Sequence, residues 1–339
     1  MGMMREHFGV LPTGEVVERV TLVGGGLTAN ILTYGAVIHD LRLDGHQPAL
    51  VLGFETLQSY LDHSPFFGAT PGRCSNRIAD GVFSIDGSAF HLERNEKGVT
   101  HLHGGSDGLA VRNWEIVDLG ADFVVLGITD PDGRAGYPGN CRVTARYSLS
   151  EGGTLGVVYQ STSDAATLCN ICQHSYFNLD GRPDAFDHVI SIAADHYLPV
   201  DDRLIPTGEV RPVDGTVFDL RQPTALQVQR HGEKIAYDHN FCLSPERGEM
   251  RSAARVTSPH SGVSLEVRTT EPGVQLYTGV MIPAMQVPGL DGRVYGPFAG
   301  FCLETQVWPD AINHAGFPNA ILRPGETLLQ ETAYIFTKG

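Results

Sequence analysis

The feature that most constrains this sequence is the alternation of apolar and polar residues in short segments separated by turn residues. Residues 83–92 alternate on both sides of the pair Asp86-Gly87. Asp-Gly between two such segments is a strong hairpin signal, because both turn residues accept a positive φ. Residues 145–150 and 154–159 alternate in the same way around Glu151-Gly152-Gly153. The chain is therefore expected to consist mainly of short antiparallel strands.

The turn signals continue along the chain, whereas helical signals are few. Asp-Gly pairs occur at eight places with no fixed period, which indicates strand boundaries and not a tandem repeat. The best candidate helix extends from Phe54 to His63. Strand patterning runs from about Val20 to Phe336 without a Ser- or Pro-rich linker. We expect one all-β domain over residues 1–339, a large antiparallel β-sandwich with few short helices, although two adjacent sandwiches also fit the length.

Charge and motif content narrow the range of partners. The chain has 24 Lys+Arg and 39 Asp+Glu, a formal net charge of −15, and no basic cluster. Nucleic acids and anionic membranes favour clustered positive charge, so neither is expected as a partner. The absence of a P-loop and of a dinucleotide-binding glycine motif argues against ATP and dinucleotide chemistry. No segment is typical of a signal peptide or a membrane span, so we expect a cytoplasmic protein whose six cysteines are reduced.

Residues suited to catalysis first appear in two segments near the N-terminal third of the chain. Residues 72–78 place two arginines and Asn76 beside a predicted hairpin, although a solvated strand edge is the more ordinary interpretation. His101 and His103 are alternate residues of an extended segment and are expected to point the same way. The glycines that follow them would allow a ligand to approach closely.

Three further segments carry polar residues in apolar surroundings. His174 interrupts an apolar and aromatic stretch, where a lone histidine is more often a core residue than a catalyst. Residues 237–241 are acidic and aromatic and are predicted to form a loop. Glu304 lies in an apolar strand, whose low polarity would raise the pKa of its carboxyl group.

Together these segments resemble the aldose 1-epimerase family, also called galactose mutarotases. The matching blocks occur in the family's order and are Asn76–Gly81, Leu102–Gly105, Gln173–Leu179, Asp238–Phe241 and Leu303–Gln306 followed by Phe317–Glu326. The resemblance implies the galactose mutarotase-like supersandwich fold and an isomerase that interconverts the α- and β-anomers of free aldoses such as glucose and galactose. It also implies a small-molecule sugar as partner, a monomer or homodimer, and no metal or organic cofactor.

The resemblance further implies roles for individual residues. His174 would be the general acid and Glu304 the general base. The sugar-binding residues would be Asn76, Arg77, His103, Asp238 and Gln275. Two segments depart from the family pattern. Residues 169–173 replace the common Val-Asn-Leu-Thr-Asn, which changes the surroundings of His174, and Val280 to Arg293 do not match the usual Asn-Phe-Leu continuation, which affects substrate preference.

Anomer exchange requires one group to take the proton of the C1 hydroxyl while another protonates the ring oxygen. An ordinary pKa near 6.5 would leave His174 mostly neutral at pH 7. We therefore expect the carboxylates of Glu304 and Asp238 to raise the pKa of His174. The value of kcat/KM should then be bell-shaped in pH, with the acidic limb set by Glu304 and the alkaline limb by His174.

Metal chemistry would be a different use of the same side chains. His101, His103, His174 and Glu304 could form a His/carboxylate site of the cupin type, although no suitably spaced glutamate follows His103. A zinc or redox site at Cys169-x-x-Cys172 is weaker, because there is no second cysteine pair.

A sugar ligand is also compatible with two activities besides anomer exchange of free aldoses. A hexose-6-phosphate 1-epimerase would need an arginine cluster around the phosphate, and the matched blocks contain only Arg73 and Arg77. A non-catalytic carbohydrate-binding protein would not need the pair of His174 and Glu304.

Overall fold

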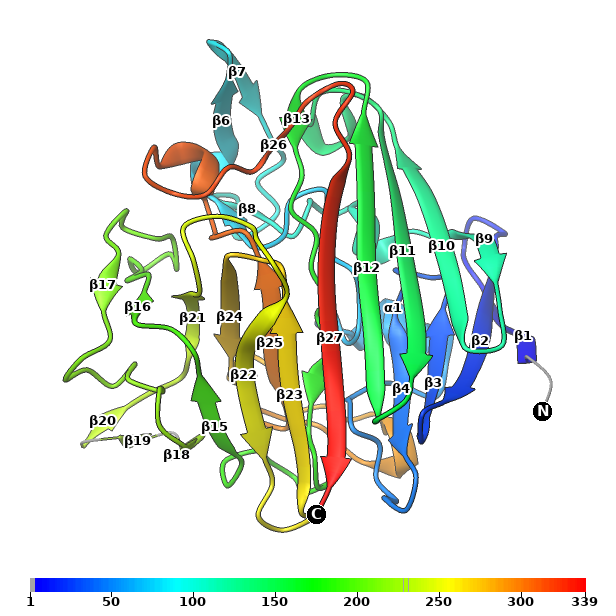
Figure 1. The fold of residues 1–339 in the computed structure, drawn as a ribbon. Coiled ribbons are helices and arrows are strands. Elements are labelled where there is room, and N and C mark those ends of the chain that lie inside the picture. Colours follow the sequence, from blue (N-terminus) through cyan, green and yellow to red (C-terminus); the bar gives the residue numbers. More distant parts are fainter. Residues whose placement is uncertain (1–3, 228, 231) are drawn as a thin grey trace.

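Antiparallel strands dominate the computed structural model, which describes residues 4–227, 229–230 and 232–339. A nine-stranded sheet forms one layer, and a six-stranded and a four-stranded sheet lie behind it (Figure 1). The expected all-β sandwich with few short helices is confirmed. Within the described residues, no helix has both the length and the apolar character needed to cross a membrane.

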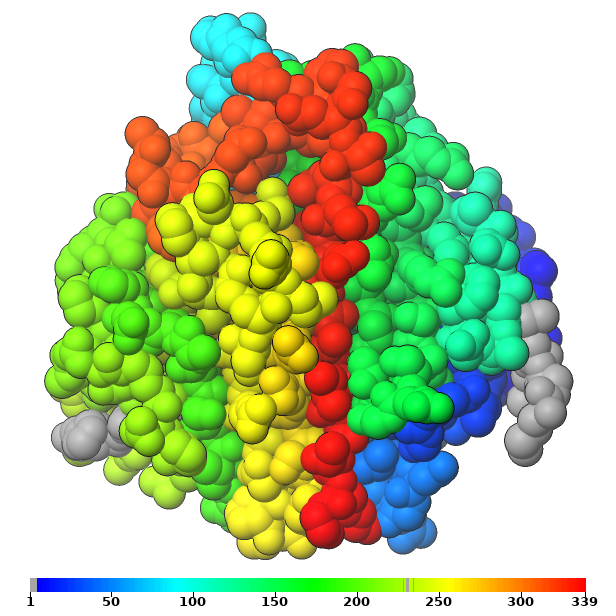
Figure 2. Space-filling model, in the orientation of Figure 1, coloured from blue at the N-terminus to red at the C-terminus, as the bar shows by residue number. Residues whose placement is uncertain are grey.

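The nine-stranded sheet is built around the C-terminal strand. Its strands, in spatial order, are β18 (Thr224–Ala225), β15 (Val189–Ile192), β22 (Arg251–Thr257), β23 (Val263–Thr269), β27 (Leu328–Lys338), β12 (Thr154–Ser163), β11 (Cys141–Ser150), β10 (Phe123–Asp130) and β9 (Glu115–Leu119). Figure 2 shows β27 in red along the middle of this face, between β23 and β12. The last strand of the chain therefore joins the two halves of the sheet.

The second layer contains the sheet that carries three of the candidate residues, Asp238, Gln275 and Glu304. The six-stranded sheet has the order β14 (Tyr176–Phe177), β25 (Phe301–Gln306), β24 (Gly273–Tyr277), β21 (Asp238–Cys242), β16 (His196–Tyr197) and β17 (Arg211–Pro212). The four-stranded sheet comprises β1 (Met4–Val10), β2 (Val16–Gly24), β3 (Leu27–Leu32) and β4 (Ile38–Leu43).

Short pairs and helical turns complete the described structure. The pairs are β5 (Arg77–Ile78) with β8 (His101–Leu102), β6 (Val82–Ile85) with β7 (Ser88–His91), β13 (Thr167–Leu168) with β26 (Ile321–Leu322), and β19 (Gln229–Arg230) with β20 (Glu233–Lys234). The helices are α1 (Leu57–His63) and the 3-10 turns Ala79–Gly81, Leu109–Val111, Arg134–Gly136, Leu290–Gly292 and Ala311–Asn313.

The local signals read from the sequence explain where these elements begin and end. Asp86 and Gly87 both have positive φ, 50° and 82°, and they join β6 to β7 as predicted. The β11–β12 hairpin is also confirmed, with Ser150 paired to Thr154. The helix starts later than expected because Thr56 caps it, accepting the backbone N–H of Ser59 at 3.2 Å.

Alternation on the six-stranded sheet separates the core from the site. Val274, Leu276, Phe301 and Leu303 join the main core with residues of the nine-stranded sheet such as Tyr334. The residues between them on β24 and β25 point to the opposite face, because successive side chains of a strand alternate. Polar side chains can therefore gather on that second face while the first remains apolar.

Candidate active site

A pocket of about 210 Å³ lies against this second face of the six-stranded sheet. Its lining residues are Pro65, Phe66, Asn76, Arg77, Glu96, Leu102, His103, His174, Tyr176, Asp238, Tyr277, Met281 and Glu304. The volume is below the ~300–1,000 Å³ typical of sites for drug-sized ligands, and it suits a smaller polar molecule.

Strand register assembles one wall of the pocket. On β21 and β24, Asp238 pairs with Tyr277 and Asn240 pairs with Gln275. Gln275 in turn pairs with Glu304 on β25. Asp238, Tyr277 and Glu304 therefore share one face of three adjacent strands. Residues 237–241 were expected in a loop, and for 238–241 this expectation is wrong, because they belong to β21, which hydrogen-bonds to neighbours on both sides.

His174 and Glu304 meet at the base of the pocket. The Nε2 atom of His174 lies 3.7 Å from Oε1 of Glu304, and the two residues are 4% and 2% exposed. Burial raises the pKa of Glu304 to about 8, and the negative charge of Asp238 adds to this effect. The expected upward shift at Glu304 is confirmed.

The expected rise at His174 is wrong. Burial lowers the pKa of His174 to about 4, because removing water disfavours the charged imidazolium. The expectation relied on neighbouring carboxylates, but Glu304 itself is held largely protonated at neutral pH. At that pH the pair of His174 and Glu304 therefore holds one titratable proton between its imidazole and its carboxyl group, located on the carboxyl group.

His103 is held in one tautomer by the backbone. The N–H of Asn76 donates to Nδ1 of His103 at 3.2 Å, so this nitrogen is unprotonated and the neutral ring carries its hydrogen on Nε2. The ring packs against Phe66 and His174, with centroid distances of 4.8 and 5.1 Å. Burial keeps the pKa of His103 well below its usual value, so the ring offers one N–H donor.

Arg77 and Asp238 are each held by polar partners. Arg77 pairs with Glu96, and Asp238 contacts Arg77 and Gln275. Arg77 makes a two-pronged ion pair with Glu96, with both nitrogen–oxygen distances 2.8 Å. Its other terminal nitrogen lies 3.6 Å from Asp238. Gln275 donates to Asp238 at 2.7 Å but does not line the pocket. Gln275 thus hydrogen-bonds to a residue of the pocket, and its direct contact with sugar hydroxyls, which the resemblance implies, stays a prediction.

Two expectations about the N-terminal segments are corrected. Arg73, Asn76 and Arg77 are at most 4% exposed, so residues 72–78 are not a solvated strand edge. His101 and His103 have different surroundings: the ring of His101 contacts the Tyr137 hydroxyl at 2.7 Å and the Glu93 carbonyl at 2.6 Å, outside the pocket lining. His103 has a φ of 54°, which departs from the extended backbone on which the predicted alternation relied.

Several lining residues were not singled out from the sequence. Phe66 and Glu96 come from loops and carried no motif, so no local signal could have identified them. Met281 belongs to the segment Val280 to Arg293, which departs from the family pattern, and it brings that segment to the pocket. Tyr176 lies inside the block Gln173–Leu179, and Tyr277 lies two residues after Gln275. Their proximity to the pocket follows from the sheet register, which sequence patterns do not reveal.

The positions and hydrogen bonds of the pocket residues also decide how well they could bind a metal ion. His103, His174 and Glu304 have candidate ligand atoms within 4.8 Å of one another. The Asn76 N–H occupies Nδ1 of His103, and the remaining nitrogen is protonated, whereas a metal ligand must present a free lone pair. Cys169 and Cys172 also have different partners, Cys141 and Glu304 respectively, so the residues fit a metal site poorly.

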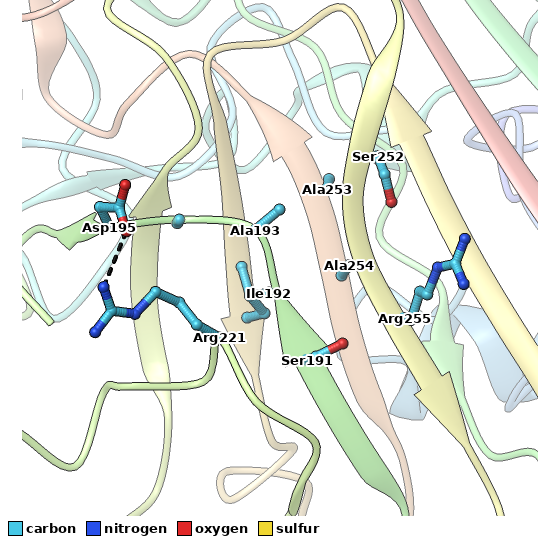
Figure 3. A pocket seen from close by; sticks show the side chains of 10 residues that line it. Ser191, Ile192, Ala193, Asp195, Arg221, Ser252, Ala253, Ala254 and Arg255 are labelled. Atoms are coloured by element: carbon cyan, nitrogen blue, oxygen red, sulfur yellow. Dashed lines mark hydrogen bonds and ion pairs between the residues drawn. The ribbon is translucent and has the colours of Figure 1, made fainter. Parts of the chain in front are cut away.

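A larger hollow of about 430 Å³ lies beside β15 and β22 (Figure 3). Its lining is dominated by small side chains, including Ser191, Ala193 and Ala253. Its two arginines are already paired: Arg221 with Asp195, as the dashed line shows, and Arg255 with a glutamate. The smaller pocket is the better candidate, because it brings together groups whose pKa values are shifted in opposite directions.

The fold and this pocket define a β-sandwich protein with a small polar ligand site that brings a histidine and a carboxylic acid together. The chain matches the profile of the family described as aldose 1-epimerase over residues 18–334. It is 43% identical to galactose mutarotase of Rattus norvegicus, over 99% of each chain, and 44% identical to that of Homo sapiens, over 98% of each. This chain belongs to the aldose 1-epimerase family.

Solved structures agree with this assignment. The galactose 1-epimerase of Lactobacillus acidophilus NCFM superimposes with a TM-score of 0.87 at 28% sequence identity. The match covers 100% of this chain and 99% of the other. The supersandwich expected from the sequence resemblance is therefore the fold of this chain.

Proposed function

We propose that this chain interconverts the α- and β-anomers of free aldohexoses such as galactose and glucose. The observation that carries the proposal is the contact of 3.7 Å between His174 and Glu304 at the base of a small polar pocket. Opening a hemiacetal needs a base at the C1 hydroxyl and an acid at the ring oxygen, and this pair supplies both.

The proton count of the pair fits one cycle of ring opening and closure. Glu304, as carboxylate, takes the proton of the C1 hydroxyl, and Nε2 of His174 delivers a proton to the ring oxygen as the bond from C1 to that oxygen breaks. Before the sugar binds, the titratable proton of the pair resides on Glu304, so it moves to His174 as the sugar hydroxyl donates to the carboxylate. After rotation about the bond between C1 and C2, the steps run in reverse and close the ring.

The remaining pocket residues hold the sugar. His103 and Arg77 provide N–H donors, Asp238 provides acceptors, and Asn76 lies beside them in the lining. Phe66 and Tyr277 add apolar surface. A site that pairs a buried acceptor with a sugar hydroxyl discriminates against a sugar lacking that hydroxyl by ~1–3 kcal/mol per contact.

The pocket favours a free aldose over a sugar phosphate. Among the described residues that line it, three are carboxylic acids, Glu96, Asp238 and Glu304, and Arg77 is the single arginine. Arg77 is already paired with Glu96 and approached by Asp238. A phosphate group would meet net negative charge there.

Polarimetry tests the proposed function. Freshly dissolved α-galactose, α-glucose and α-glucose 6-phosphate are followed with wild-type protein, His174→Ala and Glu304→Gln. We expect acceleration of the two free sugars, and a loss of ~10²–10⁴-fold in kcat for each variant. Equal rates for wild type and both variants would contradict the proposal, and a preference for the phosphate would favour the sugar-phosphate epimerase.

A further inference from the structure

Two buried thiols contact the His174–Glu304 pair on the sides that face away from the partner. Sγ of Cys172 lies 3.4 Å from Oε2 of Glu304, while Oε1 is the oxygen near His174. Sγ of Cys302 lies 3.6 Å from Nδ1 of His174. Both cysteines are at most 1% exposed. Glu304 is thus held at Oε2 and His174 at Nδ1, while Oε1 and Nε2 remain available for proton exchange.

We propose that Cys172 is a positioning residue that holds Glu304 through Oε2 by a weak S–H hydrogen bond, leaving Oε1 to exchange the proton and keeping the carboxylate strongly basic. The inference rests on the proposed function, because it assigns Cys172 a role in that reaction. A thiol is a weak donor. A hydroxyl in its place would donate a shorter and stronger bond to the carboxylate, which would make Glu304 a weaker base.

The thiol remains a donor throughout the pH range of interest. Burial and the neighbouring Glu304 keep the pKa of Cys172 well above its usual value, so the sulfur stays protonated. A hydrogen-bonded contact of S–H to carboxylate requires this state. Cys172 therefore acts on Glu304 through its S–H group and takes no part as a nucleophile.

The backbone around Cys172 is clamped from the nine-stranded sheet. Gln330 on β27 accepts the N–H of Ile171 and donates to its carbonyl oxygen, both at 3.0 Å. The amide of Gln330 also donates to the buried Glu271 at 3.0 Å. On the other side, the hydroxyl of Tyr159 on β12 donates to the carbonyl of Cys172 at 3.4 Å. The position of the thiol is thus set by the opposite layer of the sandwich.

Other charged or titratable groups lie close enough to Glu304 to interact with it electrostatically. They are Arg77 from β5, His103 and His174 from loops, Tyr176 from β14, Asp238 from β21, Tyr277 from β24, Cys302 from β25 and Tyr334 from β27. A substitution at Cys172 changes none of these other side chains. A change in the protonation of Glu304 can therefore be assigned to the lost or altered donor.

The test compares Cys172→Ser, Cys172→Ala and the matched control Cys169→Ser. Cys169 is buried in the same segment but contacts Cys141, away from the pair. We expect the alkaline limb of kcat/KM for galactose to move to lower pH by roughly one unit in Cys172→Ser and to higher pH in Cys172→Ala, as one unit corresponds to ~1.4 kcal/mol of differential stabilisation. The control should keep the wild-type limb.

A second measurement does not depend on turnover. The infrared band of the protonated carboxyl group of Glu304, identified as the band lost in Glu304→Gln, is titrated in each protein. Its midpoint should fall in Cys172→Ser and rise in Cys172→Ala. Circular dichroism and thermal unfolding establish that each variant is folded before it is compared.

The possible outcomes separate this inference from the proposed function. Wild-type protein that does not accelerate anomer exchange overturns both. Active wild-type protein whose alkaline limb and infrared midpoint stay unchanged in the two Cys172 variants overturns the inference alone. An equal shift in Cys169→Ser also overturns it, because any buried hydroxyl would then have the same effect.

Discussion

Burial controls the protonation of the two residues at the base of the pocket. It favours the neutral form of both, which moves the pKa of Glu304 up to about 8 and that of His174 down to about 4. Because the groups are 3.7 Å apart, their protons are shared by the pair and the two pKa values describe it as a unit. The order is the reverse of that expected from isolated side chains, so it favours His174 for the acidic limb and Glu304 for the alkaline limb, opposite to the assignment expected from the sequence.

The pH dependence of kcat/KM follows from this order. Between the two pKa values the pair holds one proton and can both accept and donate. Below the lower value it binds a second proton and loses its acceptor, and above the upper value it loses its last proton and has no donor. We expect a bell-shaped profile that falls below about pH 4 and above about pH 8.

Polarimetry with galactose over a wide pH range checks this profile. The uncatalysed exchange of anomers is itself accelerated by acid and base, so its rate is measured without protein and subtracted at each pH. A profile that stays flat through both pKa values would show that the pair does not control the rate.

At the scale of elements, strands and loops contribute differently to the site. Strand register places Asp238, Tyr277 and Glu304 on one wall. The loops supply the opposite wall, and they do so through residues with positive φ, among them Phe66 at 67° and His103 at 54°. Residues other than glycine adopt this conformation at a cost, so it persists where surrounding contacts enforce it.

Gly104 is one of those enforcing contacts. It has a φ of +88°, and a Cβ added there would lie 1.7 Å from the carbonyl oxygen of Gly72. We expect Gly104→Ala to lower the free energy of unfolding by more than ~3 kcal/mol, because a left-handed cost of ~1–2 kcal/mol is added to a clash with backbone. Displacement of the adjacent His103 should also lower kcat/KM.

Gly14 provides a matched control for this substitution. Its φ is +89°, and no atom lies within 4 Å of an added Cβ. Gly14→Ala should therefore show only the left-handed cost of ~1–2 kcal/mol, with unchanged kcat/KM. Urea denaturation and polarimetry measure both variants, and equal losses of stability would mean that the close approach at Gly104 has no effect.

At the scale of the whole molecule, a buried ion pair ties the pocket loops to the nine-stranded sheet. Nε of Arg73 donates to Asp130 at the end of β10 at 3.0 Å, and Arg112 donates to the second oxygen at 2.8 Å. Arg73 also donates to the carbonyl of Pro138 at 2.7 Å. The segment that contains Asn76 and Arg77 is thereby fixed to the opposite layer.

Removing the charge of Asp130 should therefore destabilise the protein strongly. Asp130→Asn leaves the guanidinium of Arg73 buried without its negative partner, which costs ~3–5 kcal/mol in comparable pairs. The control is Asp86→Asn, which removes the charge from an exposed pair with Arg323 and should leave stability nearly unchanged. Urea unfolding measures both, and similar midpoints for the two variants would refute the proposed role of the buried pair.

The sequence by itself determined the fold class and the main hairpins, and it singled out His174 and Glu304 as the candidate acid/base pair. Alternation and Asp-Gly turns depend on neighbours along the chain, so they could be read at positions such as Asp86-Gly87, and the motif blocks pointed to His174 and Glu304. Only the tertiary structure decided the order of their pKa values, the tautomer of His103 and the hydrogen bond of Gln275 to Asp238. These properties depend on how much water is excluded and on which groups, distant in sequence, approach within a few ångströms, and no local pattern records either.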